Sequence, residues 1–131
     1  MKTNIFAVVG LATLAGCTTA SPEEAAKLSA RIPPNYRAQI VDKVHGYLND
    51  PFSVKEAEIT KPTAVYGGAG QRFPGVCLRF FAKNQFGAYM GRTTFATTFR
   101  NGKLYQLYNP DISAADCASP WQSFPELNGK G

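Results

Sequence analysis

The apolar positions between residues 35 and 50 recur at spacings of three and four, which predicts an amphipathic helix. Asn35 suits the N-cap of this helix. Asp50-Pro51 ends it, because the residue before a proline avoids the helical conformation. We expect this helix to be the main helix of the fold and to bury its apolar face on a sheet. That face consists of Tyr36, Ile40, Val41, Val44, Tyr47 and Leu48.

Alternation of apolar and polar residues over positions 52–60 predicts a strand, with Glu56 and Glu58 on its polar side. Two carboxylates on one face are also what a glycosidase needs. We expect cross-strand ion pairs instead, with Arg79 or Lys83 opposite the two glutamates, because opposite charges that face each other stabilise a sheet.

Between residues 76 and 108 the alternation predicts a three-stranded antiparallel meander. Asn101-Gly102 lies between two apolar alternations, where this pair is typical of a type I′ hairpin turn. Such a turn sets the register of the last two strands. The pairs expected to face each other are Arg100–Lys103, Phe99–Leu104, Thr97–Gln106 and Phe95–Tyr108.

The register gives the meander one apolar face, which we expect under the helix, and one mixed face. Four cations belong to the mixed face: Arg79, Lys83, Arg92 and Arg100. No Asp or Glu lies between residues 60 and 110. These four are candidate anion-binding residues for lipid headgroups, a polyanionic glycan or an acidic protein. The alternative is a solvated face that keeps the domain soluble.

The glycine-rich stretch over residues 61–75 predicts a loop. Its Gly67-Gly68-Ala69-Gly70 resembles part of a phosphate-binding loop, but no Gly-Lys-Ser/Thr follows and no helix begins after it. We therefore interpret this stretch as a flexible connection.

The beginning of the chain has the pattern of a secretory signal peptide: Lys2, then an uncharged apolar run over residues 5–14, then small residues. As a helix the run would reach about 15 Å, half of the hydrocarbon core of a bilayer, so it is too short to be a comfortable membrane span. It ends in Leu14-Ala15-Gly16-Cys17, which resembles the lipobox of bacterial lipoproteins.

That resemblance implies cleavage before Cys17, acylation of its sulfur and a lipid-anchored location in the cell envelope. Two or three acyl chains anchor a protein stably where one chain is marginal. Thr18 follows the cysteine, where an Asp would retain an enterobacterial lipoprotein at the inner membrane. The resemblance therefore favours the outer membrane, with the protein facing the periplasm.

The domain organisation follows from these segments. We expect a signal peptide over residues 1–16, a lipidated N-terminus and tether over 17–34, and a single small α+β domain over 35–131. Ser21, Pro22 and Glu24 have the pattern that caps a short helix within the tether. The expected domain is one main helix on an antiparallel meander of about four strands, with a disulfide-pinned C-terminal tail.

Two cysteines remain after processing, and in an oxidising envelope they are expected to pair. Cys77 and Cys117 are far from C-x-x-C spacing, so we expect neither a redox nor a zinc role. A disulfide across a loop of this size contributes roughly 4 kcal/mol. It would bring the tail over the mixed face, with Trp121 and Phe124 covering part of it.

His45 is the only histidine, with Asp42 one helical turn before it and Ser53 as a conceivable nucleophile. The position of His45 at the flank of the apolar stripe is typical of a partly buried histidine. We therefore expect no enzyme. One histidine and scattered carboxylates also argue against a metal site, and no cofactor is expected.

Residues 82–91, AKNQFGAYMG, resemble a hairpin of small uncharacterised proteobacterial proteins with the pattern Ala-Lys-Asn-x-Phe/Tyr-Gly-Gly-Tyr-x-Gly. Ala88 stands where that pattern has its second Gly, and the resemblance implies no activity. Asn84 and Gly87 suit the positive φ of a turn, and Gly91 suggests a bulge.

Two functions follow from the sequence. The first is a membrane-anchored envelope lipoprotein with a non-catalytic binding or structural role, whose partners are the membrane and an anionic envelope component or envelope protein. The alternative is a small inhibitor or accessory protein of a periplasmic enzyme or envelope complex, as among lipoprotein lysozyme inhibitors. Phe81 and Tyr105 among the cations resemble a nucleic-acid surface, but the compartment argues against nucleic acid as a partner.

Overall fold

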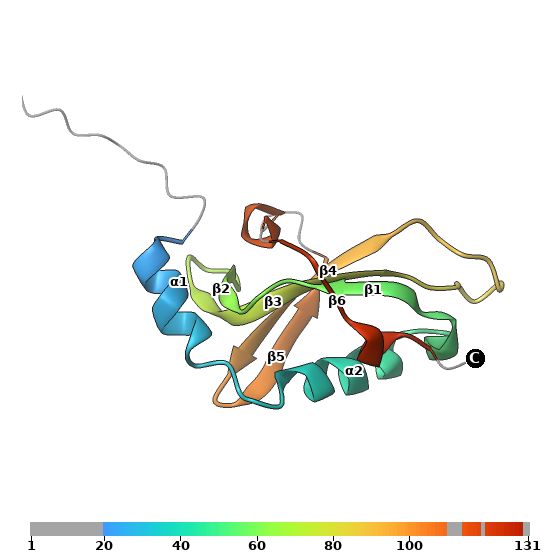
Figure 1. The fold of residues 1–131 in the computed structure, drawn as a ribbon, viewed down its shortest axis with the longest axis horizontal. Coiled ribbons are helices and arrows are strands. Elements are labelled where there is room, and N and C mark those ends of the chain that lie inside the picture. Colours follow the sequence, from blue (N-terminus) through green and yellow to red (C-terminus); the bar gives the residue numbers. More distant parts are fainter. Residues whose placement is uncertain (1–19, 110–113, 119, 130–131) are drawn as a thin grey trace, which may run out of the picture.

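The computed structural model describes residues 20–109, 114–118 and 120–129, which form two helices and a six-stranded antiparallel sheet (Figure 1). This confirms the α+β class, with two strands more than expected. The helices are α1 (Pro22–Ser29) and α2 (Tyr36–Tyr47). The strands are β1 (Lys55–Ile59), β2 (Thr63–Tyr66), β3 (Arg72–Phe81), β4 (Thr93–Arg100), β5 (Lys103–Tyr108) and β6 (Gln122–Ser123). Three short 3-10 turns are η1 (Pro51–Ser53), η2 (Ala114–Cys117) and η3 (Pro125–Leu127).

The strand order is β5-β4-β3-β1-β6, and β2 also pairs with β3. β3 is long enough for two partners on one side: its first half pairs with β2 and its second half with β1. β2 corrects the prediction of a loop over 61–75, because residues Thr63–Tyr66 form a hairpin with β3. Ala64 and Val65 are buried there, and Gly67-Gly68-Ala69-Gly70 makes the turn.

The main core lies between α2 and the sheet (Figure 1). Ile40 and Val44 of α2 are fully buried, as the helical spacing predicts. They pack with the inward side chains Val76, Leu78, Phe80, Phe95 and Phe99. Tyr47 was expected on the buried face but is 64% exposed, and its ring makes an edge-to-face contact with that of Phe95, at a centroid distance of 5.7 Å.

The β4–β5 hairpin turns at Asn101-Gly102, which both have positive φ. Arg100 faces Lys103 and Phe99 faces Leu104, as predicted. Beyond them a β-bulge adds one residue to β5, so the predicted pairs Thr97–Gln106 and Phe95–Tyr108 are wrong. The observed pairs are Thr98–Gln106, Thr97–Leu107 and Ala96–Tyr108. A bulge changes the side to which every later side chain points, which places Leu107 on the helix face and Tyr108 on the other.

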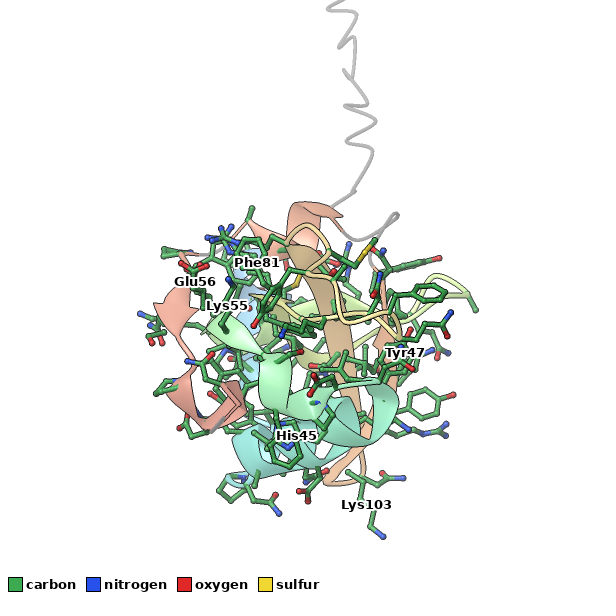
Figure 2. All side chains as sticks on the ribbon, turned by 90° about the vertical axis from the view of Figure 1, so that its right-hand side faces the viewer. His45, Tyr47, Lys55, Glu56, Phe81 and Lys103 are labelled. Atoms are coloured by element: carbon green, nitrogen blue, oxygen red, sulfur yellow. A yellow bond between two sulfur atoms is a disulfide. The ribbon has the colours of Figure 1, made fainter. Side chains whose placement is uncertain are left out.

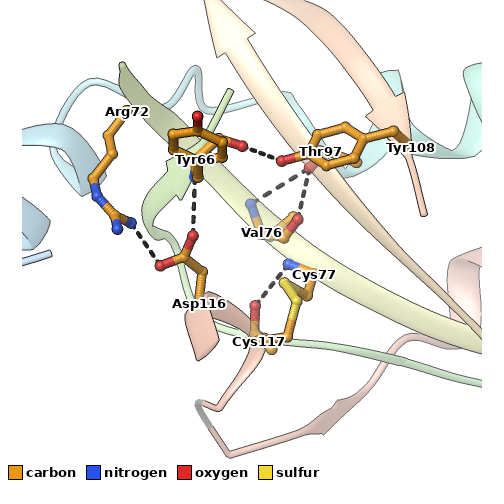
Figure 3. Close-up of a disulfide and its surroundings, with 9 residues drawn as sticks. Tyr66, Arg72, Val76, Cys77, Thr97, Tyr108, Asp116 and Cys117 are labelled. Atoms are coloured by element: carbon orange, nitrogen blue, oxygen red, sulfur yellow. Dashed lines mark hydrogen bonds and ion pairs between the residues drawn. A yellow bond between two sulfur atoms is a disulfide. The ribbon is translucent and has the colours of Figure 1, made fainter. Parts of the chain in front are cut away.

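A second, smaller cluster lies on the face opposite α2. Val65, Cys77 and Ala96 are buried there, packed against Tyr108, Cys117 and Trp121. The predicted Cys77–Cys117 disulfide is present, with a Cα–Cα distance of 5.5 Å, and it holds the tail on this face (Figure 3).

Phe124 corrects one detail of the tail. It was expected on the mixed face, but it is fully buried in the main core. The reason is β6, which pairs with the outer edge of β1 and carries the chain round that edge to the helix side. Leu127 of η3 then joins the same core.

α1 is capped as its sequence predicts: the Ser21 hydroxyl oxygen accepts a hydrogen bond from the Glu24 amide, and Pro22 occupies the first turn. The helix lies beside β2 and β3 at one end of the sheet (Figure 1). The described part of the predicted tether, residues 20–34, therefore runs along the sheet. No helix in the described part of the chain is long and apolar enough to cross a membrane.

Candidate functional site

Arg79, the first of the predicted cations, is already engaged. Its guanidinium donates two hydrogen bonds of 3.2 Å to the carboxylate of Glu58, the residue opposite it on β1. Trp121 of the tail covers it, with the guanidinium carbon 4.2 Å from the ring centroid. The predicted cross-strand pair is thus confirmed for Glu58. Glu56 instead lies at a bulge with φ of 52° and is exposed.

Arg92 uses the same carboxylate. Its Nη1 lies 3.8 Å from Glu58 Oε1, and its guanidinium lies over the Phe81 ring at 5.1 Å. One glutamate therefore offsets part of the positive charge of two arginines. The net positive charge around Arg79 and Arg92 is smaller than a count of cations alone predicts.

Lys83 and Arg100 lie toward opposite ends of the sheet. Lys83 follows β3, whereas Arg100 ends β4, a strand that spans about 25 Å. Arg100 lies over the ring of Tyr105 at 5.6 Å. Arg100 is therefore separated along the sheet from the other three predicted cations, so the four do not form one continuous surface. Cys17 lies outside the described residues.

His45, Asp42 and Ser53 are not joined by any hydrogen bond in the described structure. The nearest polar partner of His45 Nε2 is the Leu127 carbonyl oxygen, at 3.4 Å. The Ser53 hydroxyl donates to the Asp50 carbonyl at 2.6 Å and accepts from the Lys83 amide at 2.8 Å. It therefore supports two loops. Within the described ranges, no group of three or more His, Cys, Asp or Glu could hold a metal ion.

A different feature distinguishes the surface: large apolar side chains gather at one end. Among the described residues six such side chains are exposed, and only Tyr105 lies elsewhere. We call the other five the end patch: Tyr47, Phe52, Phe86, Tyr89 and Met90. Large exposed apolar patches often mark sites of interaction with a partner.

The loop between β3 and β4 presents three members of the end patch on an ordered backbone. Asn84 Oδ1 accepts hydrogen bonds from the amides of Phe86 and Ala88, at 2.9 and 3.1 Å, and Gly87 supplies a φ of 75°. Within residues 82–91, Gly87 has the positive φ expected of it and Asn84 does not. Phe86 lies in the turn of the loop and is 83% exposed.

Tyr89 joins this loop to the rest of the end patch. Its hydroxyl donates to the Ser53 carbonyl at 2.9 Å, beside Phe52 of η1. Two cations lie over its ring, Lys55 Nζ at 4.0 Å and Lys83 Nζ at 5.3 Å from the centroid. The end patch therefore has an aromatic surface with a cationic rim.

Two grooves flank the loop. One, of about 420 Å³, runs between the end of α2 and the loop, with Tyr47, Leu48, Ala82 and Met90 among its lining residues. The other, of about 430 Å³, is more polar and is lined among others by Phe52, Lys55, Lys83 and Tyr89. The end patch thus contains two grooves in which a segment of a partner protein can bind.

The end patch lies at the opposite end of the sheet from α1 (Figure 1). Figure 2 looks onto this end, with Tyr47 and Lys55 on either side of it. No family model, curated protein or solved structure matches this chain.

Proposed function

We propose that this protein is a lipid-anchored lipoprotein of the cell envelope, at the outer membrane and facing the periplasm, whose domain binds a partner protein without catalysis. The observation that supports this most is the end patch, because five of the six large apolar side chains exposed in the described residues lie at one end of the domain. Aromatic side chains of this kind dominate the binding energy of protein interfaces.

The anchor rests on Leu14-Ala15-Gly16-Cys17. From Cys17 to Ala20, where the described structure begins, the chain can extend at most about 10 Å. A lipid on Cys17 would therefore hold the α1 end of the domain near the membrane. The end patch, at the other end of the sheet, would face the periplasm.

The partner that fits the end patch is a protein with an apolar segment flanked by carboxylates. Burial of one Phe or Met side chain contributes about 1.5–3 kcal/mol, so Phe86 and Met90 are the expected anchors. The cationic rim of Lys55 and Lys83 favours acidic flanks and would repel a basic partner.

An inhibitor or accessory protein of a periplasmic enzyme is the second candidate. It is favoured by the β3–β4 loop, which projects from the sheet (Figure 1). The turn of this loop carries the exposed Phe86. In that case the loop would enter a cleft of the enzyme. Both candidates use the same surface, and they differ in whether binding stops a reaction.

Two measurements test the proposal. An alkyne fatty acid should label the full chain and should fail to label Cys17→Ser; continued labelling and membrane pelleting of that variant would refute the anchor. Copurification from detergent-solubilised envelopes tests the end patch. Phe86→Ser should lose a partner that Tyr105→Ser, the matched exposed aromatic outside the patch, retains. Equal recovery of that partner by both variants would refute the binding role.

A further inference from the structure

A pocket of about 460 Å³ lies at the α1 end of the domain, away from the end patch. It is formed by the segment between α1 and α2, the start of β3 and the β4–β5 turn. Its lining residues include three arginines: Arg31, Arg72 and Arg100. The remaining lining residues are Phe73, Pro74, Phe99, Asn101 and Gly102.

The three arginines differ in how they are held. Arg72 is fixed by Asp116, with an Nη1–Oδ1 distance of 2.6 Å, and its side chain is only 12% exposed. Arg31 and Arg100 are exposed, and neither forms an ion pair with a carboxylate in the described part of the chain. Among the described residues, no acidic side chain lines the pocket. After the charge of Asp116 is counted, about two positive charges remain in the pocket.

We propose that this pocket binds a phosphate group. A dianionic phosphate would offset the two remaining charges, and the guanidinium of arginine matches its oxygens with paired hydrogen bonds. The side-chain amide of Asn101 adds a neutral donor at the rim. Arg72 is oriented by its ion pair before any ligand arrives, so less conformational freedom is lost on binding.

The position of the pocket favours a phosphate on a membrane lipid as the source. At most about 30 Å of chain separates Cys17 from Arg31, because α1 takes up only 1.5 Å per residue. The lipid source rests on the anchor in the proposed function, whereas the phosphate site rests on the arginines alone. A free phosphate is the other source.

The first arm of the test measures the site itself. The full chain, purified in a neutral maltoside detergent, is titrated with inorganic phosphate while the Nε–Hε signals of its arginines are followed by NMR. The signals of Arg31 and Arg100 should shift saturably, and Arg31→Gln should weaken the affinity about tenfold, as the loss of a charge-assisted hydrogen bond does. Lys103→Gln, which removes an exposed cation next to the pocket, should change it less than twofold. Arg72 is left intact, because its ion pair supports the fold.

The second arm separates the sources. The same signals are compared in nanodiscs of phosphatidylcholine with and without lipid A, which carries phosphate monoesters. A shift with lipid A that Arg31→Gln abolishes supports the lipid source. A response to inorganic phosphate with none to lipid A identifies a site for free phosphate and overturns the lipid source. Absence of a shift in both arms, or equal affinity of wild type and Arg31→Gln, overturns the site, whatever the labelling of Cys17 shows.

Discussion

The carboxylate of Asp116 lies 2.6 Å from the guanidinium of Arg72, one residue before the disulfide at Cys117 (Figure 3). Its second oxygen accepts a hydrogen bond of 3.0 Å from the Tyr66 amide. The tail is thus held by adjacent covalent and ionic links, one to the middle of β3 and one to the β2–β3 hairpin.

Removal of this charge should cost more stability than a surface change. The side chain of Asp116 is only 3% exposed, and breaking a buried ion pair by removing one partner costs about 3–5 kcal/mol. We expect Asp116→Asn to lower the free energy of unfolding by about 3 kcal/mol in urea denaturation. Asp42→Asn, at an exposed position of α2, should stay within about 0.5 kcal/mol of wild type. Equal effects of the two substitutions would contradict the structure.

The disulfide should stabilise the domain by limiting the unfolded chain. Cys77 and Cys117 are 40 positions apart, a loop for which chain entropy gives about 4 kcal/mol. We expect the double variant Cys77→Ala/Cys117→Ala to lose about 4 kcal/mol of unfolding free energy in urea denaturation. We also expect a protease to cleave this variant early in the tail. Non-reducing mass spectrometry should find the two cysteine peptides linked, and two free thiols in protein taken from the envelope would disprove the pairing.

Two glycines should respond in opposite ways to alanine. A Cβ on Gly75 would overlap the Thr97 carbonyl oxygen and press on Val65, so Gly75→Ala should separate β3 from β4 and destabilise the domain by several kcal/mol. Gly46 in α2 has open space around it, and Gly46→Ala should raise the free energy of unfolding by up to about 1 kcal/mol. Thermal unfolding of both variants checks this, and a stable Gly75→Ala domain would refute the described strand packing.

A small pH effect is expected where η3 meets α2. Arg37 donates hydrogen bonds of 3.1 and 2.7 Å to Glu126, and these bonds lower the pKa of Glu126 below its ordinary value. The pair therefore adds stability above the pKa of an unfolded-chain glutamate and loses it as the pH falls through the lowered folded-state pKa. Glu126 is half exposed, which limits the effect to a few tenths of a kcal/mol. Glu126→Gln should be slightly less stable than wild type at neutral pH and equal to it in acid; a constant difference would exclude this ionisation as the cause.

The elements with strong local signals were predictable from the sequence. The helical spacing from Tyr36 to Leu48 anticipates α2, and Asn101-Gly102 anticipates its hairpin because both residues tolerate positive φ. The disulfide was predictable from the two cysteines Cys77 and Cys117 and from the oxidising compartment that the signal-peptide pattern predicts. Alternation put Glu58 and Arg79 on the same side of the sheet and offered Arg79 as one of two partners, but it could not show the bulge in β1 that leaves Glu56 without the same pairing.

The parts that depend on tertiary packing were not predictable. The bulge at Tyr105 leaves no mark in the apolar–polar alternation of the β5 sequence. It nevertheless reverses the faces of the sheet on which Leu107 and Tyr108 lie. β2 was interpreted as part of a loop because it is short and is followed directly by Gly67-Gly68-Ala69-Gly70. Phe124 reaches the main core only because β6 turns round the edge of β1.

The candidate site had a usable local signal that hydrophobic periodicity overlooks. Phe86 stands in the turn Asn84-Gln85-Phe86-Gly87, and an aromatic residue at the tip of a turn points away from the sheet core. Phe52 follows Pro51, in the short turn between the helix α2 and the strand β1. The distribution of the predicted cations could not be foreseen, because it depends on which strands bring Glu58 between Arg79 and Arg92.

Site-specific photo-crosslinking in living cells tests the central claim most directly. A photoreactive benzoyl-phenylalanine replaces Phe86 in one variant and Tyr105 in another, with the signal peptide and Cys17 intact. We predict that position 86 gives one defined protein adduct, which Lys83→Glu weakens because the acidic flanks of the partner are then repelled, and that position 105 does not give it. Adducts to lipid alone, an adduct between two copies of this chain, or the same protein adducts from both positions would contradict the proposed binding of a separate partner protein at the end patch.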